Sequence, residues 1–260
     1  MGSLSDIDNL WPPSSPTMRR QRDSTRPEQS RRQTTLTRNE IVQAAIALAD
    51  AGGEGAVNMR HIAKELDVST MSLYWHVADK QQLLEFMLDA LEGEIEPIAE
   101  GGDWRTKLTQ IALQKRQSLL RHPWVVSFFD ERPAFGPNSL LQIERALAAL
   151  DDFDLGTTLK LGILMTLDTY LTGSALNELR EIRVEKAQIE ATQTNSAYQA
   201  TMERWMELLD QSGRFVRVLR ILQDGVDADA AETRDERFQF GLDCVLDGIE
   251  ARIPRVTRNL

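Results

Sequence analysis

Apolar side chains recur three and four residues apart along most of the chain, starting just after Thr37. This spacing corresponds to one face of an α-helix, and no segment shows the two-residue alternation typical of a strand. A capping box, TRNE, opens the first helix at Thr37, and the glycines of AGGEG end it. The same spacing predicts further helices near 58–65, 69–77, 80–96, 103–121, 124–131, 138–150, 155–182, 184–211 and 234–252. The pattern therefore predicts an all-α protein.

One short predicted helix carries three adjacent bulky side chains, in the sequence DVSTMSLYWHV. A helix has only one stripe that faces a core, and here Leu73 and Val77 occupy it. The remaining side chains should therefore point outward together. They are Thr70, Met71, Ser72, Tyr74, Trp75 and His76.

The preceding helix, the turn LDVS and this segment together predict a helix-turn-helix, whose second helix enters the major groove of DNA. Asp67 stands in the turn where glycine is usual, and aspartate tolerates left-handed backbone better than most residues. The alternative is that Tyr74 and Trp75 pack against the next helix, at 80–96.

The stretch MRHIAKELDVSTMSLYWHVADKQQLLEFMLDAL resembles the DNA-binding segment of the tetracycline-repressor (TetR) family. The resemblance implies a three-helix DNA-binding domain at 37–84 and a larger helical domain at 85–260 that binds an effector and dimerises. It also implies which residues contact DNA. Thr70, Met71 and Ser72 would read bases, Arg60 would contact a base or phosphate, and Tyr74, Trp75, His76 and Lys80 would hold phosphates.

Charge is distributed unevenly along a chain whose formal net charge is −10. Residues 1–36 are rich in Pro, Ser, Arg, Gln and Thr, which predicts a disordered arm. Residues 1–38 carry a net +3, whereas 39–90 carry three basic and eight acidic residues, a net −5. Since cations dominate non-specific DNA affinity, the arm is a candidate for additional DNA contacts. A solvated tail without a role is the alternative.

Composition restricts the functional class further. The single cysteine, Cys244, excludes a disulfide within the chain and fits a reduced, cytoplasmic location. Neither a signal peptide nor an uninterrupted apolar stretch of about 18 residues is present, so no membrane association is expected. With one Cys, three His and no catalytic motif, an enzyme is not expected. An all-α enzyme would need titratable groups converging in a cleft.

Two segments of the larger domain are candidates for a dimer interface. Residues 161–177 contain one charge, Asp168, and a helix that is apolar on every side belongs in a core or between subunits. Residues 237–253 place an apolar stripe on one helix face, and Gly241 and Gly248 would admit a close partner helix. Two such helices doubled by a two-fold axis would form a four-helix interface in a homodimer. The stripe consists of Phe238, Leu242, Val245, Leu246, Ile249 and Ile253.

Aromatic and apolar walls with a few polar groups suit a site for a small hydrophobic effector. The candidates are Trp104, Trp124, Phe128, Phe129, Met165, Asp168, Thr169 and Trp205. For each aromatic residue, an ordinary place in the core is the alternative. A buried Asp168 would need a partner in the protein or in a ligand, because an unpaired buried carboxylate is costly.

The resemblance to the tetracycline repressors does not extend to their metal–drug site. Phe128 stands where those proteins have a metal-ligand histidine, and no histidine occurs in 77–121, where a second would be expected. Neither tetracycline nor any metal or cofactor is predicted, and His122 is expected to be a helix-end residue. The sequence thus predicts a homodimeric, ligand-responsive repressor of a palindromic operator. An effector-independent DNA-binding or protein-interaction regulator is the alternative.

Overall fold

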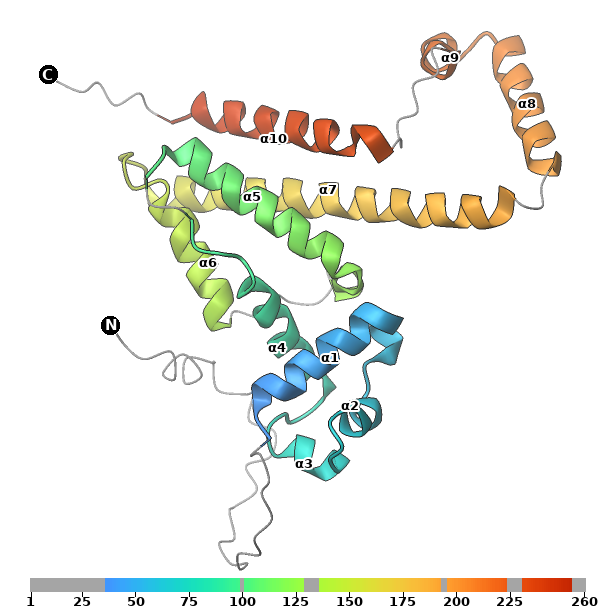
Figure 1. Cartoon of the computed structure of the whole chain (residues 1–260). Helices are drawn as coiled ribbons and strands as arrows, with labels where there is room; N and C mark the ends of the chain where they lie inside the picture. Colours follow the sequence, from blue (N-terminus) through green and yellow to red (C-terminus); the bar gives the residue numbers. More distant parts are fainter. Residues whose placement is uncertain (1–35, 99–100, 129–135, 193–195, 224–230, 254–260) are drawn as a thin grey trace, which may run out of the picture. The chain divides into compact units, whose positions relative to one another are not determined.

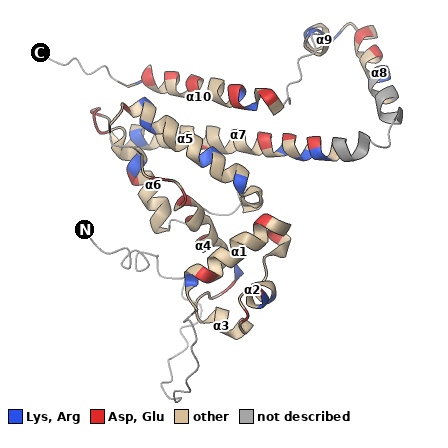
Figure 2. Ribbon diagram, viewed as in Figure 1, with Lys and Arg blue, Asp and Glu red and all other residues tan. Residues whose placement is uncertain are grey.

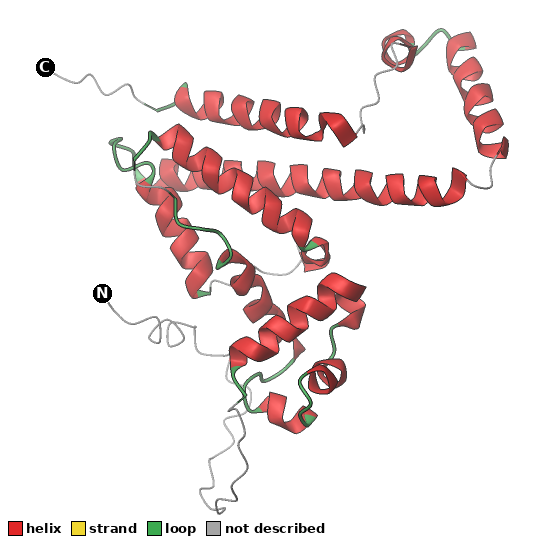
Figure 3. Cartoon of the chain, in the orientation of Figure 1, coloured by secondary structure: helices red, strands yellow, loops and turns green. Residues whose placement is uncertain are grey.

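The computed structural model describes residues 36–98, 101–128, 136–192, 196–223 and 231–253. These form two compact units, one within 1–165 together with 253–260 and the other within 166–252. Every regular element in these ranges is helical, and they contain no strand (Figure 3), which confirms the all-α prediction. None of the helices in these ranges combines the length and the apolar character that crossing a membrane requires.

Ten α-helices and three 3₁₀ segments follow one another along the described chain (Figure 1). The first unit contains α1 (Arg38–Gly52), η2 (Glu54–Ala56), α2 (Met59–Glu65), α3 (Thr70–Tyr74), α4 (Lys80–Glu92), α5 (Trp104–Arg121), η3 (Pro123–Phe128), α6 (Pro137–Ala148) and the start of α7 (Thr157–Thr192). The second contains the rest of α7, α8 (Ser196–Gln211), α9 (Val216–Gln223), η4 (Ala231–Thr233) and α10 (Arg234–Glu250).

The largest differences between the predicted and the observed helices lie in three places. The break expected at residue 183 is wrong, because no glycine or proline lies there and α7 continues to Thr192. The helix predicted at 124–131 is a 3₁₀ segment ending at Phe128, and residues 129–131 lie outside the described ranges. Helix α9 is not among the predicted helices, since a connection was expected between 211 and 234.

The predicted helix-turn-helix part of the first unit is built around a small core beneath α1 to α4. Its fully buried members include Ile41, Ile62, Leu73 and Leu83, one from each of these helices. The capping box at the start of α1 is confirmed: the Glu40 amide donates to the Thr37 hydroxyl at 3.2 Å, and the Thr37 amide donates to the Glu40 carboxylate at 2.8 Å. The hydrogen bonds from Thr37 lower the pKa of Glu40.

A buried carboxylate joins α4 to the first turn of α6. Asp89 accepts hydrogen bonds from the Ser139 amide at 2.9 Å and the Ser139 hydroxyl at 3.0 Å, and also from the Asn138 amide at 3.3 Å. A carboxylate at a helix N-terminus satisfies amides that have no partner within the helix. Gly136 permits this contact, because a Cβ there would overlap the Asp89 carboxylate.

In the second unit, α10 packs on α7 through the predicted apolar stripe. Phe238, Leu242, Leu246 and Ile249 are buried, whereas Val245 is half-buried. Gly241 lies against a helix of the same chain. A Cβ at Gly241 would lie 2.5 Å from the Tyr170 hydroxyl, so this glycine accommodates a ring from α7 of the same chain. The Tyr170 hydroxyl donates to the Phe238 carbonyl and fixes that ring.

Candidate nucleic-acid interface

The turn between α2 and α3 has the backbone that the helix-turn-helix prediction requires. Asp67 has a φ of 51° and is the only non-glycine residue with positive φ among the described residues. This left-handed residue reverses the chain, and the Val68 amide then donates to the Ala63 carbonyl at 2.9 Å. The prediction that aspartate takes the usual place of glycine here is confirmed.

Each of the three helices after α1 begins with a side-chain cap. Asn58 accepts from the His61 amide at 2.9 Å, Ser69 from the Ser72 amide at 3.1 Å, and Asp79 from the Gln82 amide at 2.8 Å. These local hydrogen bonds determine the residue at which each helix begins. For α3, that starting point determines which of its side chains point toward solvent.

Helix α3 buries one side and exposes the other. Leu73 and Val77 are 0% and 1% exposed, whereas Met71 and Trp75 are 67% and 82% exposed. Tyr74 keeps 49% of its surface exposed. The alternative in which the two aromatic rings pack against the next helix is therefore wrong for Trp75.

The remaining predicted DNA contacts differ in their surroundings. Thr70, Ser72 and His76 are half-buried, and the Ser72 hydroxyl lies 2.8 Å from that of Ser69. Arg60 is exposed at the start of α2. Lys80 is exposed, but its ammonium lies 3.6 Å from the Glu54 carboxylate, so a phosphate would compete with that ion pair.

Lys64 is a candidate DNA contact that is not among the residues predicted from the sequence. It is exposed on α2, one turn after Arg60, so both cations project from the same side of the helix. The spacing of four residues is the signal that could have identified it. Acidic residues also lie on α1, α2 and α4, whereas α3 carries no charged residue (Figure 2).

Comparisons with known proteins identify both parts of the chain. The family described as "Bacterial regulatory proteins, tetR family" matches residues 41–87, and "Tetracyclin repressor-like, C-terminal domain" matches residues 96–253. The chain belongs to the TetR family. This confirms the resemblance found in the sequence. TetR proteins are DNA-binding transcription regulators rather than enzymes, so this chain is a regulator of that kind.

Several relatives within the TetR family are similar over most of the chain. The transcriptional repressor DrrR1 of Streptomyces coeruleorubidus is 30% identical over 84% of this chain and 79% of its own length. A transcriptional regulator of Saccharopolyspora erythraea is 37% identical over 59% of this chain and 66% of its own. The crystal structure of Streptomyces coelicolor ActR with actinorhodin matches with a TM-score of 0.67 and 25% identity, over 86% of this chain and 99% of ActR.

The residues predicted to line an effector site occupy several different environments. Trp124 and Phe128 are buried in η3, where their rings meet edge to face at 6.1 Å between centroids, which favours the core alternative for both. Trp104 is half-buried against Phe153, and Phe129 lies outside the described residues. The others are exposed, namely Met165, Asp168, Thr169 and Trp205. Asp168 is exposed in the single chain, so it does not meet the cost that an unpaired buried carboxylate would carry.

A groove of about 650 Å³ lies between α7 and α10 in the second unit, and among the predicted effector residues only Thr169 lines it. Its walls include Glu181, which receives hydrogen bonds from Arg237 at 2.9 and 2.7 Å and from Arg234 at 3.3 Å. These contacts, led by the hydrogen bond from Arg237, lower the pKa of Glu181. The groove is more polar than the apolar pocket expected from the sequence.

Proposed function

We propose that this regulator binds a palindromic operator as a homodimer and is released from it by a small hydrophobic effector. The observation that supports this most directly is the exposure of Met71, Tyr74 and Trp75 on α3, opposite the fully buried Leu73. One such helix reaches only a few base pairs, whereas two copies placed about one DNA turn apart read both halves of a palindrome.

In this proposal some residues of the helix-turn-helix contact DNA bases and others contact the phosphate backbone. Thr70, Met71 and Ser72 read base edges, with the Met71 side chain against a thymine methyl group. Phosphates are held by the following side chains: Arg60, Tyr74, Trp75, His76 and Lys80. The Arg-rich arm at 1–36 adds cations in the flanking minor groove, where arginine is favoured.

The homodimer would pair α7 and α10 of one protomer with those of its partner. Within the second unit, helix α7 buries Leu167 and Leu171 but leaves Val184 46% exposed. On α10, Phe240 is 72% exposed. Large exposed apolar side chains on two neighbouring helices are typical of a surface that another subunit covers.

Release by an effector is proposed by analogy with relatives. ActR has been crystallised with actinorhodin and with (S)-DNPA, so at least one similar regulator binds small organic molecules. An effector can release DNA only if it prefers a conformation whose recognition helices no longer match the operator. The candidates for its site remain those predicted from the sequence, with Met165, Asp168 and Thr169 on the exposed side of α7.

A selection experiment tests the proposal. The purified chain would be used to select bound duplexes from a random pool, and the selected sequences would be aligned. We expect a palindrome whose half-sites lie about one helical turn apart, and release of the duplex by some members of a panel of actinorhodin and other small apolar compounds. Recovery of no preferred sequence would contradict operator binding. A palindrome that no compound releases would favour the effector-independent alternative.

A further inference from the structure

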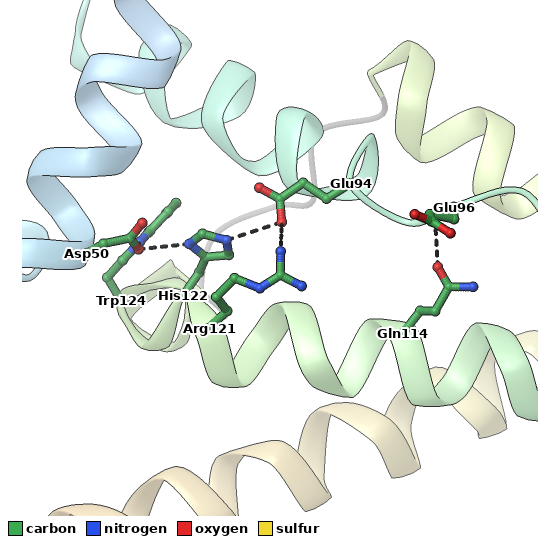
Figure 4. A network of polar contacts seen from close by, with 7 residues as sticks. All are labelled: Asp50, Glu94, Glu96, Gln114, Arg121, His122 and Trp124. Atoms are coloured by element: carbon green, nitrogen blue, oxygen red, sulfur yellow. Dashed lines mark hydrogen bonds and ion pairs between the residues drawn. The ribbon is translucent and has the colours of Figure 1, made fainter.

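A buried histidine lies between two carboxylates in the first unit (Figure 4). His122 is 4% exposed; its Nδ1 lies 2.8 Å from Asp50 Oδ1, and its Nε2 lies 3.2 Å from Glu94 Oε2. The same Asp50 oxygen accepts the indole N–H of Trp124 at 2.7 Å, and the Glu94 oxygen accepts from Arg121 at 2.9 Å. An ionised carboxylate can only accept hydrogen bonds, so the imidazole ring donates to both carboxylates when both of its nitrogens carry a proton.

These contacts cross the boundary between the two parts of the chain that the family comparisons define. Asp50 is in the last turn of α1, within the DNA-binding part at 41–87. His122 is the C-cap of α5 and Trp124 is the second residue of η3, and both lie within the C-terminal domain part at 96–253. The larger domain therefore contacts α1 through these hydrogen bonds, in addition to its covalent connection to the chain after α4.

The arrangement is suited to transmit small displacements. One oxygen of Asp50 receives two donors that stand two residues apart, and both donor residues are buried in the larger domain. Hydrogen bonds of this kind tolerate little change in distance or angle, and a buried donor that loses its acceptor is costly. A shift of the end of α5 must therefore move the end of α1 or break both bonds.

We infer that His122 and Trp124 are positioning residues that couple the effector domain to the DNA-reading helices through Asp50. This inference rests on the proposed function, since it assigns a route for the regulation of the same interface. Coupling between two binding sites is reciprocal, so the occupation of α3 by DNA must also alter the surroundings of Trp124. That consequence can be measured without knowing the effector.

Fluorine NMR of the full-length dimer labelled with 5-fluorotryptophan provides the measurement. The chain has five tryptophans, and Trp124→Phe assigns the resonance of interest. On addition of the duplex selected above, we expect the Trp75 signal to shift by direct contact and the Trp124 signal to shift through Asp50. Trp104 packs against Phe153 within the larger domain and should shift least.

Two variants separate coupling from a merely structural role. Asp50→Ala removes the shared acceptor and should abolish at least half of the Trp124 shift, while the Trp75 shift persists. If Asp50→Ala does not fold, His122→Ala provides the second test. It removes one of the two donors to Asp50 and should reduce the Trp124 shift, although the Trp124–Asp50 hydrogen bond remains. Asp151→Asn is the matched control, because Asp151 pairs with Lys160 at 2.8 Å away from this network. The control should leave both shifts unchanged.

The outcomes distinguish this inference from the function on which it rests. A duplex that shifts Trp75 but leaves Trp124 in place overturns the coupling and leaves DNA binding intact. An equal Trp124 shift in wild type and in the variants without the Asp50–His122 hydrogen bond also overturns it. If no duplex is selected and Trp75 never responds, the proposed function and the coupling both fail.

Discussion

Replacing Tyr74 by alanine separates the stability of the recognition helix from its affinity for DNA. Tyr74 is 49% exposed on α3, and its neighbour Leu73, which is 0% exposed, supplies the core contact of this turn. Loss of a half-exposed ring should change the free energy of unfolding by less than about 1 kcal/mol, since it leaves no large cavity in the core. Loss of an interaction with DNA should weaken operator binding by about 1–3 kcal/mol.

The two effects are measured independently. Fluorescence anisotropy with the selected duplex at fixed salt should show a dissociation constant about 5- to 150-fold higher for Tyr74→Ala. Urea unfolding of the same preparation should show nearly the wild-type midpoint. Tyr74→Phe retains the ring and should recover affinity except for the part due to a hydroxyl–phosphate hydrogen bond.

The matched control replaces another aromatic residue of similar exposure. Trp205 is 47% exposed on α8, so Trp205→Ala removes a ring of comparable accessibility outside the helix-turn-helix. It should leave effector-free DNA affinity unchanged. Wild-type affinity in Tyr74→Ala, or an equal loss in Trp205→Ala, would refute the assignment of the α3 face to DNA.

Three further predictions concern the two units and the arm. Gly241→Ala places a Cβ 2.5 Å from the Tyr170 hydroxyl and should lower the free energy of unfolding by about 1–3 kcal/mol. Urea denaturation measures this change. An unchanged stability would mean that Tyr170 moves aside freely. The pKa of Glu181 is lowered from 4.5, so its ion pairs stabilise the folded protein above that pH, and this stabilisation is lost as the pH falls further. In thermal melts, Glu181→Gln should therefore be less stable than the wild type at pH 7. It should also lose less stability than the wild type between pH 7 and pH 3. Deleting residues 1–36 should reduce the slope of log affinity against log salt by about 0.9 for each phosphate that the arm neutralises, and an unchanged slope would assign the arm no role in binding.

Much of the DNA-reading part was predictable because its determinants are local. The capping box at Thr37, the left-handed Asp67 and the burial of Leu73 opposite Trp75 each depend on residues within about one helical turn. Periodicity and capping are read from such short windows. The roles proposed for the α3 side chains toward DNA stay predictions, as do the domain boundaries at 37–84 and 85–260.

The larger domain was predicted less well because its helices are ambiguous in sequence. Helix α7 is 36 residues long and has no glycine or proline after Gly173, so its end could not be placed from periodicity. Burial of Asp168 was expected because its neighbours are apolar, yet this residue lies on the exposed side of α7. Which side of a largely apolar helix faces the chain's own core depends on the helices packed against it.

Short patterns of neighbouring residues were enough to establish that the chain is helical, where its recognition helix begins and which family it belongs to. The folded chain was needed to show that Asp50 and His122, 72 residues apart, share a hydrogen bond, and that Gly241 accommodates Tyr170. The physical reason is that such contacts depend on how separate helices pack. Packing depends on the shape of a whole core, which no window of neighbouring residues contains.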